Sequence, residues 1–375
     1  MSLRRLLGLS AAVSDRLNHS LSTSTDAYSR PPWILLDQVM LTTGADGLLF
    51  LIVYDLHATA PILAKQGPNH VRRLTGLDPG HTPDITRFLC NPLTGQLTRL
   101  PAIGAGREKF GCGPHMGVLT QAGRAHGDPG RLAVAELQGN MMLRFLSDRA
   151  KWEVAVTAPW QLPLARQFYS ETGRTDQEAF AFGGRLWWAD LSWGAVSADP
   201  FSDRPEPRFV ELPRGSVVPA RPERAAGWLD LEGMKAVSKA ALGRYRRMGV
   251  SEGRVRYVEV WEREPFVLSS YAVDDEGGGW TLEHRVVLSR LWADGDHPWL
   301  PLPEKTMPQI GALDPLNGNV IYLTVGMHII GVDMSKEEVI GSSLHNGSTF
   351  CVPCMLPPSL ESTRIHAAGN RFNWY

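Results

Sequence analysis

The chain has 375 residues, of which 43% are hydrophobic and 21% charged, a balance typical of a globular protein rather than a disordered one. The 38 basic and 39 acidic side chains leave a formal net charge of -1. This balance lacks the basic field that releases counterions from nucleic acid, so we expect no nucleic-acid partner. The 27 prolines and 37 glycines are spread along the chain, which excludes a mainly helical protein and favours many short elements joined by turns.

Residues 1–31 form an N-terminal extension that is basic, acid-poor and rich in Ser and Thr. Arg4, Arg5 and Arg16 lie opposite one helical face of apolar residues, namely Leu3, Leu6, Leu7, Val13 and Leu17. Such a segment is typical of a mitochondrial or plastid transit peptide, and a disordered tail or a helix packed on the domain fits equally well. Without a transit peptide, the cytoplasm or nucleus is expected.

After residue 31 one phrase recurs, in which a turn ending in glycine precedes a short run of β-branched, aromatic and Leu residues. Glycine suits such turns because it reaches positive φ without a Cβ clash. The runs have the length and composition of buried strands. The five phrases begin at Gly47, Gly130, Gly184, Gly253 and Gly318.

A second phrase, Asx-Pro followed by a turn, occurs at Asn91-Pro92, Asp199-Pro200 and Asp314-Pro315. Proline ends a strand by removing a ladder donor, and the Asx side chain can close a turn. The phrases are spaced by roughly two repeats of about 50 residues, the period of kelch-type blades.

Residues 248–287 read as one complete blade of four strands joined by tight turns. A lone sheet of this kind exposes apolar faces that only neighbouring sheets can cover, so a closed ring satisfies burial. We predict an all-β, propeller-like ring of about six blades over residues 32–360. A short helix at 231–245 is expected as an insertion, and residues 361–375 as a C-terminal tail.

Several phrases resemble a plant family known as domain of unknown function 1618. They are FLCNPLTG at residues 88–95, GRLWWADL at 184–191, ADP at 198–200, FVELP at 209–213 and MGVSEGRVRYVEV at 248–260. The resemblance covers residues 35–360 and implies a plant protein with a propeller-like fold related to F-box-associated and kelch domains. It implies no established activity and transfers no catalytic residue. No F-box-like helical module precedes the β region, so an adaptor role in a ubiquitin ligase is not implied.

The four cysteines are too few for a disulfide scaffold and favour an intracellular, reduced protein. Only Cys351 and Cys354 are close, and a zinc site or thioredoxin motif is disfavoured because no second pair exists and Pro357 and Pro358 follow. No apolar run is long enough to cross a bilayer. The longest, from Gly47 to Tyr54, has the length of a strand, so no membrane partner is expected.

Other candidate groups are better explained structurally. The glycine loops at 104–107 and 111–114 lack a following Gly-Lys-Ser/Thr, so inter-blade loops are expected there. The basic run of Arg244, Arg246 and Arg247 is interpreted as a solvated face. Asp55, Asp190, Asp274 and Asp275 are interpreted as turn residues. The histidines, at 57, 115, 284, 297 and 328 among others, show no metal-ligand spacing.

The tryptophans indicate more about packing and binding than any polar residue of the sequence does. Trp187 and Trp188 are adjacent and therefore face opposite ways in a strand. We expect one to be core and the other to lie between blades or at the surface. Core packing is also expected for Trp193, Trp280, Trp292 and Trp299, with one or two tryptophans free to act as a binding hot spot.

These features predict a monomeric, non-enzymatic module that binds an unidentified protein or peptide, with no catalytic, cofactor or metal residues assigned. That function rests on analogy between folds. The alternative is a propeller hydrolase or lactonase with a metal in the central channel, favoured if three or more Asp, Glu, Asn or His side chains converge at channel-facing strand starts. A third hypothesis is a small-ligand sensor with a pocket between the helical insertion and the ring.

Overall fold

The computed structural model describes the chain in stretches. These are residues 33–36, 40–43, 47–55, 58–66, 72–77, 84–91, 96–104, 116–121, 130–159, 178–218, 239–261, 263–274, 279–294, 307–326, 328–344 and 351–354. The predicted N-terminal extension and C-terminal tail lie outside them.

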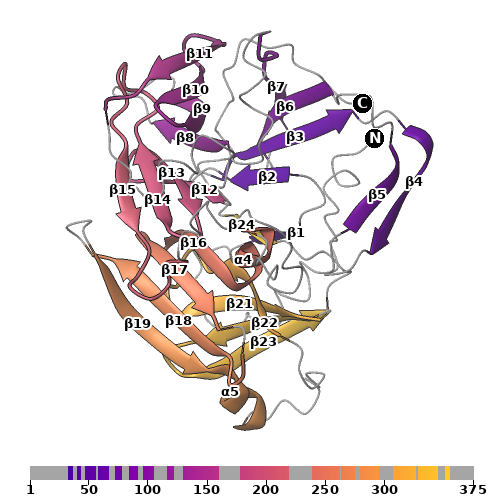
Figure 1. Cartoon of the computed structure of the whole chain (residues 1–375), viewed down its shortest axis with the longest axis vertical. Coiled ribbons are helices and arrows are strands. Elements are labelled where there is room, and N and C mark those ends of the chain that lie inside the picture. The colour runs from indigo at the N-terminus through magenta and orange to yellow at the C-terminus, as the bar shows by residue number, and fades with distance from the viewer. Residues whose placement is uncertain are drawn as a thin grey trace, which may run out of the picture.

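Five four-stranded antiparallel sheets, here called blades 1 to 5, follow one another along the described chain (Figure 1). Blade 1 comprises β2 (Met40–Thr43), β3 (Leu49–Asp55), β6 (Asp84–Cys90) and β7 (Leu97–Arg99); blade 2 comprises β8 (Gly117–Gln121), β9 (Arg131–Gln138), β10 (Met141–Leu146) and β11 (Lys151–Val156); blade 3 comprises β12 (Glu178–Phe182), β13 (Arg185–Asp190), β14 (Gly194–Ala198) and β15 (Arg208–Glu211); blade 4 comprises β16 (Arg246–Ser251), β17 (Arg254–Val260), β18 (Val267–Val273) and β19 (Trp280–Val287); blade 5 comprises β20 (Gln309–Leu313), β21 (Val320–Val325), β22 (His328–Asp333) and β23 (Glu338–Leu344).

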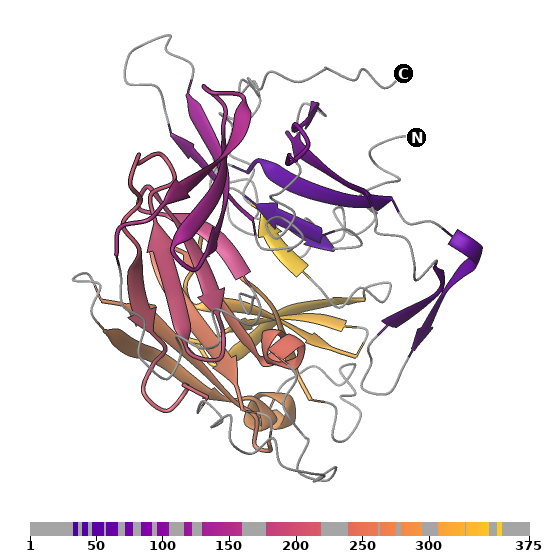
Figure 2. The same cartoon turned by 45° about the horizontal axis from the view of Figure 1, so that its top comes forward.

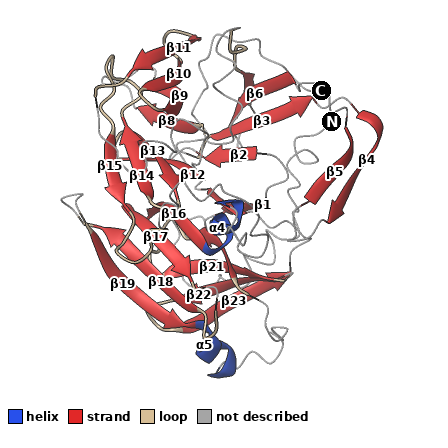
Figure 3. Cartoon of the chain, in the orientation of Figure 1, coloured by secondary structure: helices blue, strands red, loops and turns tan. Residues whose placement is uncertain are grey.

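Two further sheets have two strands each. The hairpin of β4 (Ala58–Gln66) and β5 (Arg72–Leu77) is inserted between the second and third strands of blade 1. β1 (Trp33–Leu36) pairs antiparallel with β24 (Cys351–Cys354) and so joins the two ends of the described chain. The helices are α4 (Lys239–Tyr245), which lies against β16 and β20, and α5 (Leu288–Asp294), at the periphery in Figure 3.

The blades form a ring, as the sequence predicts, with their first strands innermost (Figures 1 and 2). β8, β12, β16 and β20 contact one another in order, and β24 contacts both β20 and β2. The predicted count of about six blades is corrected to five, because the sector between blades 5 and 1 holds the two-stranded β1–β24 sheet and no described four-stranded one. Residues 248–287 do form a complete blade, now blade 4.

The five glycine-led phrases coincide with the second strands of the five blades, namely β3, β9, β13, β17 and β21. Gly47, Gly184 and Gly253 have φ of 83°, 71° and 68°, the conformation that the tight turn before each strand requires. Gly318 is glycine for another reason, because a Cβ there would clash with the guanidinium of Arg256 in blade 4.

Gly184→Ala is expected to lower the free energy of unfolding by about 1 kcal/mol. A Cβ in the left-handed region costs roughly 1–2 kcal/mol, and the lower chain entropy of alanine in the unfolded state offsets part of this. Gly249→Ala, in the middle of β16, is the control, since its Cβ would meet open space without positive φ. Denaturant unfolding of both variants checks this, and equal losses would contradict it.

The hydrophobic core lies in the seams between blades. Each of four seams holds its own cluster of buried apolar side chains, and the cluster between blades 4 and 5 includes Val258, Leu268, Ile310 and Ile330. This distribution follows from the short strands, because each sheet can only bury its faces against the next sheet.

Trp187 and Trp188 face opposite seams, as predicted from their adjacency. Trp188 packs between blades 2 and 3 and Trp187 between blades 3 and 4. The expected division into one core and one inter-blade residue is therefore wrong, since the seams are the core and both side chains are buried.

The Asx-Pro phrases close turns as expected. Asp199 Oδ1 accepts the N–H of Phe201 at 2.8 Å, and Asp314 Oδ1 accepts that of Leu316 at 2.8 Å. Asn91 and Asp199 follow the third strands of blades 1 and 3, two blades apart. Asp314 follows the first strand of blade 5, so the apparent two-blade period does not extend to it.

The predicted helical insertion is confirmed at Lys239–Tyr245, directly before β16. The earlier part of the predicted helix, residues 231–238, lies outside the described stretches.

Candidate functional site

The starts of the inner strands are the positions at which a channel site would assemble. The first residues of β2, β8, β12, β16, β20 and β24 are Met40, Gly117, Glu178, Arg246, Gln309 and Cys351. Glu178 is thus the one carboxylate at these six described positions. Its Oε1 lies 2.9 Å from Nη1 of Arg247, and its Oε2 accepts the backbone N–H of Met248 at 2.6 Å.

Arg247 extends this contact to a third inner strand, because its Nε donates to the carbonyl of Ile310 in β20 at 3.4 Å. The two charged side chains are 12% and 17% exposed. Burial of this kind tends to raise the pKa of the Glu178 carboxyl, and Arg247 opposes the shift. The pair therefore ties blades 3, 4 and 5 together near the ring axis.

Arg246 turns away from Arg247 into the seam between blades 3 and 4. Its Nη1 donates to the carbonyls of Leu191 and Ser216, at 2.9 and 2.6 Å, and its Nη2 lies 3.8 Å from Oε2 of Glu259. The interpretation of this basic run as a solvated face is wrong for Arg246 and Arg247. Each is mostly buried. Arg246 pairs with Glu259 of its own blade and donates to two carbonyls beyond it, and Arg247 pairs with Glu178 of blade 3 and donates to the Ile310 carbonyl of blade 5. Spacing along one strand could not reveal these contacts.

Glu259 is the centre of this second network. Its Oε1 accepts the hydroxyl of Ser216 and its Oε2 that of Tyr257, both at 2.9 Å. Desolvation, with the nearby carboxylate as the next cause, raises the pKa of Tyr257 far above its ordinary value. Ser216 is 2% exposed, so this Ser, Glu and Tyr are enclosed in the seam away from any substrate in solution.

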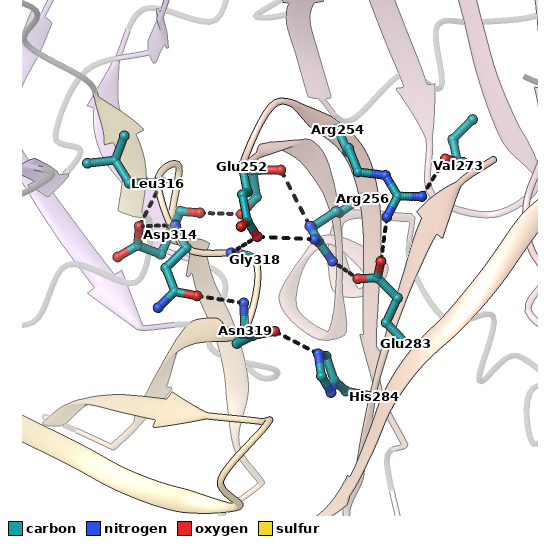
Figure 4. Close-up of polar contacts among 12 residues, drawn as sticks. Glu252, Arg254, Arg256, Val273, Glu283, His284, Asp314, Leu316, Gly318 and Asn319 are labelled. Atoms are coloured by element: carbon teal, nitrogen blue, oxygen red, sulfur yellow. Dashed lines mark hydrogen bonds and ion pairs between the residues drawn. The ribbon is translucent and has the colours of Figure 1, made fainter. Parts of the chain in front are cut away.

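A third network joins blades 4 and 5, and Figure 4 shows it. The guanidinium of Arg256, 4% exposed, pairs with Glu283 of β19, and Arg254 Nη1 contacts the other oxygen of Glu283 at 2.7 Å. Arg256 Nη2 also lies 3.6 Å from Glu252. Two arginines and two carboxylates thus balance their charges within blade 4.

The loop at residues 314–319 of blade 5 completes this network. Glu252 accepts the N–H of Gly318 at 3.2 Å and its own N–H donates to the carbonyl of Pro315 at 2.9 Å. His284 Nε2 and Asn319 Oδ1 lie 2.8 Å apart, so the ring nitrogen donates. Figure 4 shows these side chains facing one another across the seam.

A buried arginine makes a comparable contact between blades 2 and 3. Arg144, 3% exposed, pairs with Glu153 of its own blade at 2.7 Å and donates to the carbonyl of Pro200 at 2.9 Å, with Ser202 as a further acceptor. Between blades 2 and 3 and between blades 3 and 4, a buried arginine donates to backbone carbonyls of the other blade, and between blades 4 and 5 the half-exposed Glu252 accepts a backbone N–H. The arrangement fixes the blades in register, since buried charges are tolerated only when paired and hydrogen-bonded.

Of the remaining candidates, Asp190 and Asp274 are turn residues, as predicted. Asp190 Oδ1 accepts the N–H of Ser192 at 2.9 Å, and Asp274 pairs with Gly279 across the hairpin through its backbone and accepts the Thr281 hydroxyl at 2.5 Å. The side chain of Asp55, at the end of β3, and Asp275 lie outside the described residues, as do the glycine loops from residue 105 to 115.

Cys351 and Cys354 are the first and last residues of the four-residue strand β24. Their side chains, and Cys112, are outside the described set. Cys90 is buried, and burial raises the pKa of its thiol to about 11, which keeps it protonated at neutral pH. Of the five histidines named above, only His284 and His328 fall in the described stretches, where no group of three His, Cys, Asp or Glu could hold a metal ion.

Asp333 forms a turn like that of Asp190, and its contacts make it sensitive to pH. Burial alone would raise the pKa of this carboxyl, but hydrogen bonds from the Ser335 hydroxyl and from the N–H groups of Ser335 and Lys336 outweigh it and lower the pKa. Stability from an acid with a lowered pKa is present above the unfolded value of about 3.9 and is lost as pH falls through the folded value.

We therefore expect Asp333→Ala to be less stable than the native chain at pH 7, with the difference shrinking below about pH 4. Denaturant unfolding at a series of pH values measures it. A difference that stays constant from pH 7 to pH 3 would contradict this role.

One exposed aromatic side chain was missed by sequence reasoning. Trp261, directly after β17, is 54% exposed, whereas the other described tryptophans are at least partly buried. The guanidinium of Arg285 lies 5.5 Å from its ring centroid, and its backbone N–H donates to the carbonyl of Val267 at 3.0 Å. The sequence around Trp261 gives no sign of its exposure, because this residue follows an apolar strand of the same kind as those that carry the buried tryptophans.

Comparisons with known proteins agree with the sequence resemblance over part of the chain. The family described as "Protein of unknown function (DUF1618)" matches residues 188–322, from β13 to β21, which supports a relation to this family. No curated protein matches significantly in sequence. None of the described helices is long and apolar enough to cross a membrane.

Solved structures match this chain in shape only at low TM-scores. Apo AztD from Citrobacter koseri is 12% identical with a TM-score of 0.35, covering 85% of this chain and 90% of that one. The Cps50 (Swd1) β-propeller domain of Myceliophteria thermophila is 7% identical with a TM-score of 0.32, covering 86% and 90%. At these scores the similarities carry no argument about function.

Proposed function

We propose that this chain is a non-enzymatic module that binds a protein or peptide at the corner of blade 4 marked by Trp261. The single observation behind the proposal is the exposure of this indole, 54%, beside the guanidinium of Arg285. Trp and Arg are the residue types most enriched among interface hot spots, where a few large side chains carry most of the binding free energy.

The polar groups of the ring are consistent with this proposal. The charged networks near the axis and in the seams are paired within the protein, and Glu178 is the one acid among the described inner-strand starts. A metal site of a channel hydrolase would need three or more convergent Asp, Glu, Asn or His side chains at the starts of the inner strands. Among the described starts there is one such residue, Glu178, and it is bonded to Arg247 and to the N–H of Met248.

Affinity capture from cells that express the chain tests the proposal, with the native chain, Trp261→Ala and Val156→Ala as baits. Val156 is the matched control because it is 63% exposed on another blade. We expect partners that are recovered reproducibly with native and Val156→Ala baits and lost with Trp261→Ala. Absence of any reproducible partner, together with stoichiometric metal in the purified protein, would instead favour the hydrolase.

A further inference from the structure

The surface around Trp261 is basic as well as aromatic. Arg263, Arg285 and Arg290 are exposed there, against one exposed described carboxylate, Glu264. These arginines come from three separate elements, the turn after β17, the strand β19 and the helix α5, so their proximity is a product of the fold.

Backbone hydrogen bonds fix the three elements against one another. Phe266 N–H donates to the carbonyl of Arg263 at 2.9 Å and closes the turn after β17. Leu288 and Ser289, at the start of α5, donate to the carbonyls of Phe266 and Pro265 at 3.0 and 3.3 Å. These bonds hold the turn after β17 against the start of α5.

The seams contain arginines of a different kind. Arg144, Arg246, Arg247 and Arg256 each bond a carboxylate of the protein. Arg285 instead lies with its guanidinium carbon 5.5 Å from the centroid of the exposed Trp261 ring, and Arg285 is itself exposed. Such a guanidinium is suited to bidentate contact with a carboxylate from outside.

We propose that this corner, defined by Trp261, Arg263, Arg285 and Arg290, binds an acidic peptide segment, in which Asp or Glu side chains pair with the arginines and an apolar side chain covers the indole. The proposal rests on the function proposed above and adds the chemistry of the partner. Charge complementarity favours the acidic segment, since the three exposed guanidinium groups outnumber Glu264, the one exposed carboxylate described there.

A library of random peptides displayed on phage, selected on the full-length immobilised protein, provides the test. Enriched sequences are synthesised with a fluorophore, and their dissociation constants are measured by anisotropy for the native chain, Trp261→Ala and Arg285→Glu. The matched controls are Val156→Ala and Arg204→Glu, both at exposed positions on other blades. Unfolding midpoints establish that every variant is folded.

We expect enriched peptides with net negative charge, whose dissociation constants rise about tenfold or more in Trp261→Ala and Arg285→Glu and stay unchanged in both controls. Their binding also weakens as salt is raised. Peptides that are enriched but bind all variants equally, or that are neutral or basic, would overturn the acidic-segment site and leave the binding function intact. Failure to enrich any peptide would count against the proposed function itself.

Discussion

Trp188→Ala is expected to lower the free energy of unfolding by about 3–5 kcal/mol, the range for removing a large aromatic side chain from a packed core. Trp188 is 2% exposed and is the largest fully buried side chain described. It packs with Leu119, Leu137 and Met142 of blade 2 and Val196 of its own blade. Its removal opens a cavity in the seam, which two sheets locked by neighbours on either side cannot close.

Trp261→Ala is the matched comparison, because it deletes the same side chain from an exposed position. It is expected to change the free energy of unfolding by less than about 0.5 kcal/mol, as surface substitutions generally do. Trp188→Phe should fall between the two, since the smaller ring keeps part of the packing. Chemical denaturation of all three variants measures this, and similar losses for both alanine variants would refute the assignment of the seams as the core.

Glu283→Ala is expected to cost about 3–5 kcal/mol, because it leaves the buried guanidinium of Arg256 without its main counter-ion. Glu283 joins Arg254 and Arg256, which are 39% and 4% exposed. Only Arg254 can turn to water when the carboxylate is removed. Arg256 stays between the blades beside Gly318, where the more exposed Glu252, at 3.6 Å, compensates in part.

The control for this prediction is Glu338→Ala, which removes the carboxylate of an exposed ion pair with Lys336 at 3.4 Å. No measurable change is expected there, since solvent screens such pairs. Urea titration of Glu283→Ala, Glu338→Ala and the native chain distinguishes the two cases. If Glu283→Ala unfolds at the native midpoint, the pairing of Glu283 with Arg256 in Figure 4 does not stabilise the fold.

The all-β ring could be predicted from the sequence because its signals are local. A glycine precedes each second strand, and the turn requires it at Gly47, Gly184 and Gly253, where φ is positive; the five phrases mark the five blades. The predicted count of about six is too high by one, because a two-stranded sheet and no described four-stranded sheet lies between blades 5 and 1. The sector between β20 and β2 contains strands from the two ends of the described chain, a pairing over a distance that no local pattern encodes.

The polar contacts could not be predicted for the same physical reason. Arg246 and Arg247 are adjacent in β16 and therefore point to opposite sides. Arg246 donates to the carbonyl of Ser216, whereas Arg247 contacts Glu178 of blade 3 and the carbonyl of Ile310 in blade 5. Gly318 looks like a turn glycine, yet its constraint is the Arg256 guanidinium of another blade. The exposure of Trp261 likewise depends on where β17 ends relative to β19 and α5, which only the assembled ring determines.

The most direct test is hydroxyl-radical footprinting of the native protein, with the oxidation rate of each tryptophan measured by mass spectrometry. We expect fast oxidation of Trp261 and strong protection of Trp187 and Trp188, which the seams bury. Oxidation of Trp188 as fast as that of Trp261 would contradict the assignment of the seams as the core, because the blades would then not shield Trp188 from solvent. Trp261 would also no longer stand out as the exposed tryptophan.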